Sequence, residues 1–135
     1  MNDLSEKKRF YYKAKVTKVI DGDTVDLEIK LGFNIIYTER FRLWGINSPE
    51  SRSANLQEKE LGEKAKLALE SLLFDENGSK EVLVHTVKKE KFGRILAELF
   101  VDELNIGQEL IKMGLAREYF GERRVPWFSD EEIHD

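Results

Sequence analysis

The sequence predicts a mainly β domain of the α+β class, built as a closed barrel of five short strands with two helices. Three observations support this fold class. Apolar and polar residues alternate with a period of two in successive segments near the N-terminus. One stretch with a helical period follows, and then come two apolar, β-branched runs and a shorter helical pattern. Strands that follow one another before the first helix favour a small closed barrel over a parallel βαβ sheet.

The first three strands are predicted between residues 12 and 44. Their alternating apolar positions are Tyr12, Ala14 and Val16 in the first strand and Val25, Leu27, Ile29 and Leu31 in the second. The alternation slips at 19–20, which predicts a bulge or a sharp bend. Gly22 stands in the turn between these two strands, where it is free to adopt a positive φ. The third strand is expected over residues 35–44.

The next elements are a loop, a helix and two strands. Residues 51–57 are polar and predict a loop, whereas residues 58–74 have the period of a helix with one apolar stripe. That stripe consists of Leu61, Ala65, Ala68, Leu69, Leu72 and Leu73. Residues 82–87 and 94–101 predict the fourth and fifth strands.

A second helix is expected at the end of this series. It covers residues 106–113, with Asn105 as its N-cap and Gly114 just past its end. Five strands with a helix between the third and the fourth are the element order of the OB-fold, a Greek-key barrel.

Length and composition indicate one domain over residues 1–135, with flexible ends at 1–8 and 129–135. The net charge of −4 disfavours bulk binding to nucleic acid, but basic residues cluster near the N-terminus and in residues 88–94. For any one of these lysines taken singly, a solvated surface position is the better interpretation. The chain has no cysteine, so disulfides and thiolate metal sites are excluded.

Two further expectations concern the surroundings of the protein. No apolar run reaches the roughly 18 residues that a membrane span needs, so we expect no membrane association. Residues 1–8 lack the apolar segment of a secretory signal, and we therefore expect a cytoplasmic protein. Separately, we expect a monomer. Secretion stays open if a leader has been removed.

The stretch over residues 41–50 combines the groups that could carry chemistry. Arg42 lies between two apolar residues, so in a strand it points to the opposite face from both. Pro49 ends the strand because it has no N–H to donate, and Glu50 is therefore presented at a strand end. Two other stretches carry complementary polar groups, Asp21–Thr24 and Lys91–Arg94.

Each of these groups also has a purely structural interpretation. The two aspartates of the first turn could simply form that turn. Arg42 could belong to a structural ion pair, for example with Glu50. His85 lies in a predicted strand and is expected to be structural, and Trp44 is expected in the core.

Taken together and in order, these stretches resemble the staphylococcal nuclease (thermonuclease) family. The matching segments are residues 19–25, residues 41–43 with 48–50, residues 91–94 and residues 105–116. They span most of the chain from about Tyr12 to Ala116. The resemblance implies an OB-fold, but residues 121–135 are too few and too polar for the long C-terminal helix of the family, which we expect to be shortened or absent.

The resemblance also implies a function and a set of site residues. Family members are endonucleases that hydrolyse phosphodiester bonds of DNA and RNA, so single-stranded DNA and RNA are the expected partners and Ca²⁺ is the expected cofactor. The implied catalytic residues are Arg42, Glu50 and Arg94. The implied metal ligands are Asp23, Asn47 and Ser48 (through its backbone oxygen). Asp21 is expected next to these ligands, without touching the metal itself. The implied substrate-binding residues are Lys91 and Phe92, and Tyr119 or Phe120 could supply a ring on which a base stacks.

Asn47 departs from the family pattern, because the best-known members have aspartate at this position. An amide still offers an oxygen but removes one negative charge from the metal site, so weaker binding should follow. The alternative to an active nuclease is therefore an OB-fold nucleic-acid-binding module that has lost efficient chemistry. An interaction protein without a nucleic-acid role ranks last, because it leaves Arg42 and Arg94 without a purpose.

Overall fold

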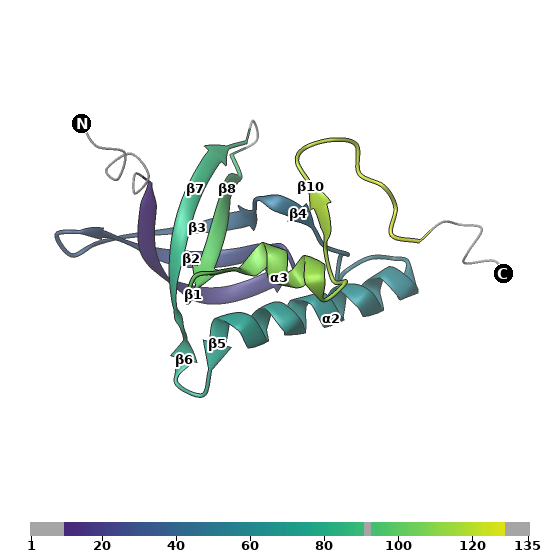
Figure 1. Cartoon of the computed structure of the whole chain (residues 1–135), viewed down its shortest axis with the longest axis horizontal. Coiled ribbons are helices and arrows are strands. Elements are labelled where there is room, and N and C mark those ends of the chain that lie inside the picture. Colours follow the sequence, from purple (N-terminus) through teal and green to yellow (C-terminus); the bar gives the residue numbers. More distant parts are fainter. Residues whose placement is uncertain (1–9, 91–92, 129–135) are drawn as a thin grey trace.

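The central feature of the molecule is a small β-barrel, seen in a computed structural model that describes residues 10–90 and 93–128 (Figure 1). The barrel strands are β1 (Tyr11–Asp21), β2 (Thr24–Gly32), β3 (Ile35–Leu43), β7 (Glu81–Lys89) and β8 (Ile95–Val101). They pair in the order β3-β2-β1-β7-β8, and a parallel pairing of β3 with β8 closes the barrel. The predicted mainly β, α+β fold of OB type is thereby confirmed.

The helices and shorter strands surround this barrel. They are α2 (Leu56–Leu73), α3 (Ile106–Lys112), β4 (Gly45–Asn47), β5 (Phe74–Asp75), β6 (Gly78–Ser79), β9 (Leu104–Asn105) and β10 (Arg117–Tyr119). Figure 1 shows α2 and α3 together on one side of the barrel, and α2 contacts β1 while α3 contacts β8. No helix in the part of the chain that the structure describes is long and apolar enough to cross a membrane.

The core forms where the strand alternation meets the apolar stripe of α2. Val25, Leu27 and Ile29 are buried at every second position of β2, as the alternation predicts, whereas Leu31 near the end of the strand is 45% exposed. Ala65, Leu69 and Leu73 repeat at the spacing of one helical turn on α2 and are fully buried. The register of β1 against β2 shifts twice beyond Val16, which confirms the predicted bulge and bends the strand around the barrel.

Helix ends follow from their capping residues. α2 begins at Leu56, two residues before its predicted start, because the Asn55 side chain accepts a hydrogen bond from the backbone N–H of Glu58 at 3.0 Å. Asn105 caps α3 in the same way, by accepting from the backbone N–H of Gln108 at 3.2 Å, as predicted. Beyond α3 the described chain contains no further helix up to residue 128, in line with the expected loss of the long C-terminal helix. The predictions for residues 1–8 and 129–135 lie outside the described residues.

Two glycines allow α2 to press against the loop that carries Ser48 and Glu50. Gly22 does not adopt the positive φ that glycine allows. What requires glycine there is space: a Cβ would lie 2.7 Å from the Cβ of Ala65 and 2.9 Å from that of Ser48. At Gly62, in α2, a Cβ would lie 2.5 Å from backbone atoms of Glu50 and Ser51. The helix therefore determines where this loop sits.

Candidate functional site

The site is centred on Arg42, a buried cation in β3. Its side chain faces away from the apolar residues beside it, yet it is only 6% exposed because other parts of the chain cover it. One guanidinium nitrogen, Nη2, lies 3.7 Å from Asp23 Oδ2 and donates to the backbone oxygen of Ile46 at 3.3 Å. The alternative ion pair between Arg42 and Glu50 is absent from the described residues, and Asp23 is the carboxylate that faces Arg42.

The charge of Arg42 is held in a poorly solvated position. Burial lowers the pKa of Arg42, and the positive charges of Arg124 and Arg94 lower it further, whereas Asp23 and, less strongly, Glu90 oppose this shift. Because the guanidinium remains charged in proteins, the direction of this shift means that Arg42 is a cation with little water around it, and Asp23 is the main charge that compensates it.

Asp23, Asn47 and Ser48, the metal ligands that the resemblance implies, lie near one another in the structure. All three are at least nine-tenths buried. The Asp23 carboxylate accepts from the backbone N–H of Ser48 at 3.0 Å and from the hydroxyl of Thr24 at 2.9 Å. The Ser48 hydroxyl is buried and has no hydrogen-bond partner within the described chain, so it is a polar group left unsatisfied inside the site.

Asp21 and Glu50 lie at the edge of this group. The carboxylate of Asp21 accepts from the backbone N–H of Ser51 at 3.1 Å and from the Ser51 hydroxyl, so Asp21 anchors the loop that follows Pro49. Glu50 is exposed, and its backbone N–H donates to Glu58 at 2.9 Å. The Glu50 side chain lines a hollow of about 220 Å³ together with Asn47, Ser48 and Glu58, which we name the Asn47 hollow.

A second hollow, of about 210 Å³, lies on the arginine side of the site and is named the arginine hollow. Arg42, Arg94 and Tyr119 line it, and the Arg42 guanidinium lies 5.3 Å from the centre of the Tyr119 ring. The parallel pairing of Phe41 with Ile95 explains why the two arginines meet, because each directly neighbours one of these residues in sequence. Arg94 is about half exposed and pairs with Glu90 at 3.0 Å. Lys91 and Phe92 lie outside the described residues.

Comparison with known proteins decides the family. Residues 40–133 match the family model described as staphylococcal nuclease homologue, which is more than half of the chain. The chain belongs to the staphylococcal nuclease family. The resemblance noted in the sequence is thus confirmed.

Three relatives are similar to this chain over most of its length. An uncharacterized protein of Methanocaldococcus jannaschii is 32% identical over 81% of this chain and 60% of its own. An uncharacterized protein of Bacillus anthracis is 31% identical over 76% of this chain and 45% of its own. An uncharacterized endonuclease of Haemophilus influenzae is 30% identical over 78% of this chain and 52% of its own. The matched region thus spans between 45% and 60% of these relatives.

Trp44 and Arg124 are site residues that the sequence analysis missed. Trp44 was expected in the core. It is instead half-buried and lines the arginine hollow. Its ring packs 5.5 Å from that of Phe120, and the Lys88 ammonium lies 5.3 Å from its centre. The sequence around Trp44 does not predict this position, because the ring packs on Phe120, which directly follows β10. Arg124 lies in a polar segment without periodicity, and no signal there distinguishes it from its neighbours.

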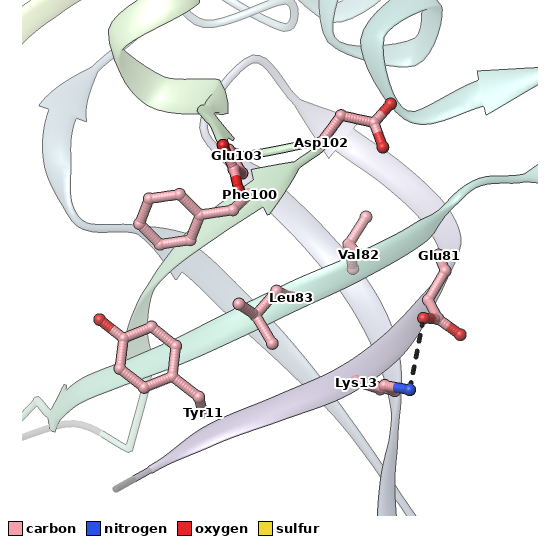
Figure 2. A pocket seen from close by; sticks show the side chains of 8 residues that line it. All are labelled: Tyr11, Lys13, Glu81, Val82, Leu83, Phe100, Asp102 and Glu103. Atoms are coloured by element: carbon pink, nitrogen blue, oxygen red, sulfur yellow. Dashed lines mark ion pairs between the residues drawn. The ribbon is translucent and has the colours of Figure 1, made fainter. Parts of the chain in front are cut away.

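A different cavity, of about 490 Å³, lies over β1, β7 and the β8–β9 turn (Figure 2). None of its lining residues lines either hollow around Arg42. Its rim carries Glu81, Asp102 and Glu103, and its one lysine, Lys13, pairs with Glu81 at 3.9 Å. This acidic rim would repel a phosphodiester, so we do not assign the nuclease site to it. His85 lies on the same face of β7 as Glu81 and Leu83. It stacks on Tyr11 at 4.3 Å and contacts Glu98, which agrees with its expected structural role.

The residues that could hold a metal ion are few. Among the described residues no group of three or more His, Cys, Asp or Glu side chains is arranged to hold a metal. Asp23, the Asn47 amide and the oxygens of Ser48 are hard donors of the kind that Ca²⁺ prefers. They carry a single formal negative charge, which faces Arg42 at 3.7 Å. These donors are of the chemical kind that a hard cation takes, and their single negative charge predicts weak binding of such an ion.

Proposed function

We propose that this chain is a calcium-assisted nuclease that hydrolyses phosphodiester bonds of single-stranded DNA and RNA. Membership of the staphylococcal nuclease family supports a nuclease-like role, and the finer assignment rests on one observation. That observation is the buried Arg42 beside Arg94 in one hollow, with Asp23 and Ser48 directly behind it. A buried arginine is costly unless it is paired. Asp23, the carboxylate that faces Arg42, lies 3.7 Å away, so N–H groups of the guanidinium are left to donate to an anion.

Arg42 and Arg94 would bind the phosphate that is cleaved. A guanidinium binds phosphate oxygens through two parallel N–H groups, and it stays charged throughout the reaction. Arg42 is held rigidly by its burial, whereas Arg94 is more exposed and would exchange its contact with Glu90 for the substrate. Both would stabilise the extra negative charge that develops on the phosphate in the transition state.

Glu50 would take the proton of the attacking water, or orient that water. Its side chain is exposed on the Asn47 hollow and makes no ion pair within the described chain, so it is open to a water molecule. The hydrogen bond from its backbone N–H to Glu58 keeps the loop in place. A carboxylate within reach of the nucleophilic water is the usual arrangement for general-base catalysis.

Asp23, Asn47 and Ser48 would hold the calcium ion. When bound, the ion would polarise a phosphate oxygen and lower the pKa of a coordinated water. Tyr119 would provide a ring for a base to stack on, because it lies at the arginine hollow next to Arg42. The roles of Lys91 and Phe92 in substrate binding remain predictions.

A nucleic-acid-binding module is the second candidate function. It is favoured by Asn47, which leaves Asp23 as the one carboxylate in the implied ligand set, and by the contact between Asp23 and Arg42. Such a module would keep the arginine hollow and the stacking ring while turning over slowly or not at all.

The test is cleavage of end-labelled single-stranded DNA and RNA with calcium in the millimolar range, compared with excess chelator. The nuclease predicts cleavage that needs calcium, and Glu50→Gln should cut its rate strongly. Equal cleavage in chelator would refute the metal role. Binding of the oligonucleotide without any cleavage would support the binding module instead.

A further inference from the structure

The segment over residues 120–128, here named the strap, covers the site from outside the barrel. It follows β10, which pairs antiparallel with β4, and it forms the yellow segment beyond β10 in Figure 1. Phe120 and Gly121 line the arginine hollow, whereas Val125, Pro126 and Trp127 line the Asn47 hollow. The strap therefore passes from one hollow to the other.

The strap is tied to β10 by Arg117. A guanidinium nitrogen of Arg117 donates to the backbone oxygens of Val125 and Pro126, each at 3.3 Å. The same guanidinium lies 3.8 Å from the centre of the Trp127 ring, a close cation–π contact. These contacts set the path of the strap across the site.

Arg124 is the strap residue that lines both hollows. Its guanidinium lies 5.6 Å from the centre of the Tyr119 ring, the same ring that Arg42 faces at 5.3 Å. Arg42 faces Asp23 and Arg94 pairs with Glu90, but Arg124 makes no ion pair with any described residue. Its positive charge acts on Arg42 and lowers the pKa of that group. Glu50 and Glu58 line the Asn47 hollow together with Arg124, but neither forms an ion pair with it in the described chain.

We propose that Arg124 binds the phosphate next to the one that is cleaved, on the side of the Asn47 hollow. An exposed, unpaired guanidinium beside another cation is arranged to receive an anion, and a polynucleotide carries one at every residue. This inference rests on the proposed nuclease function and adds to it a positioning contact for substrates longer than a single phosphodiester.

The experiment uses Arg124→Ala and the control Arg123→Ala in the whole chain. Arg123 is the exposed neighbour with the same charge, and it lines neither hollow. Binding of fluorescein-labelled single-stranded oligothymidine is titrated in chelator at several salt concentrations, and kcat and KM for its cleavage are measured with calcium. Melting curves verify that each variant folds.

Arg124→Ala should weaken binding by about ten-fold and reduce the salt slope by about 0.7, the loss of one phosphate contact on a single strand. KM should rise while kcat stays within about two-fold of wild type. Arg124→Lys keeps the charge and should restore the salt slope. Arg123→Ala should behave as wild type.

Two results would overturn this inference while leaving the nuclease in place. One is equal binding and salt slopes for Arg124→Ala and Arg123→Ala. The other is a fall in kcat with KM unchanged, which would move Arg124 onto the cleaved phosphate. If wild type neither binds nor cleaves the oligonucleotide, the proposed function fails, and the inference fails with it.

Discussion

The backbone N–H of Ser48 donates a hydrogen bond of 3.0 Å to the Asp23 carboxylate, across 25 positions of sequence. This bond joins the β1–β2 turn to the strand end that carries Asn47 and Glu50. Because the same carboxylate also faces Arg42, one aspartate links the implied metal ligands to the implied phosphate ligand. A change in the charge of this group should therefore affect metal binding, phosphate binding and stability together.

Asn47→Asp should tighten calcium binding about ten- to thirty-fold, a gain of roughly 1 to 2 kcal/mol. The carboxylate adds a charge beside the cation, and much of that gain is offset by its desolvation and by repulsion with Asp23. Without calcium the same repulsion should lower the melting temperature. A calcium titration and melting curves with and without calcium measure both effects. Asn77→Asp adds the same charge in an exposed turn and should change neither the calcium affinity nor the melting temperature. Equal calcium affinities for wild type and Asn47→Asp would mean that Asn47 is not a ligand.

Gly62→Ala should destabilise the fold by about 1 to 3 kcal/mol, although alanine normally stabilises a helix interior by about 1 kcal/mol over glycine. The new Cβ would lie 2.5 Å from backbone atoms of Glu50 and Ser51, so the loop must shift. Gly107→Ala, in α3, is the control, since its Cβ would meet side-chain atoms and not backbone, at 3.2 Å from a methyl of Ile46 and 3.4 Å from Asn105 Oδ1. Denaturant unfolding measures both variants. A more stable Gly62→Ala protein would contradict the close approach of α2 to the site loop.

Arg117→Ala should release the strap and raise KM for single-stranded DNA by about two- to five-fold, the size of an exposed cation–π contact. The reason is that Arg117 holds the backbone of Val125 and Pro126 and the ring of Trp127. Limited proteolysis should also cut within residues 120–128 faster than in wild type. An unchanged KM together with unchanged proteolysis would mean that the strap is held by other contacts.

Local rules explain which parts of the fold were predictable. Alternation with a period of two correctly predicted the burial of Val25, Leu27 and Ile29 in β2, and failed only for Leu31 near the strand end. Asn105 predicted the start of α3, because a helix cap depends on residues close in sequence. The turn at Gly22 was predicted from its residue types, but the positive φ that glycine allows is not used there. Its true constraint is contact with Ala65 and Ser48, which are distant in sequence.

The site was predictable only where a family motif covers it. Arg42, Arg94, Asp23 and Ser48 are brought together by the β3–β8 pairing and by one hydrogen bond, and neither can be deduced from spacing. Trp44 was wrongly assigned to the core, because its partner Phe120 lies beyond β10. Arg124 has no local pattern at all, and its position follows from the path of the strap.

The central claim is that Arg42 and Arg94 act on one phosphodiester. It is tested most directly by the rate at which wild type, Arg42→Lys and Arg94→Lys cleave an end-labelled single-stranded oligonucleotide in saturating calcium. Lysine keeps the charge but loses the paired N–H groups, so each variant should fold and cleave roughly a hundred-fold more slowly or worse. Rates for both folded variants close to that of wild type would make these arginines structural and contradict the account.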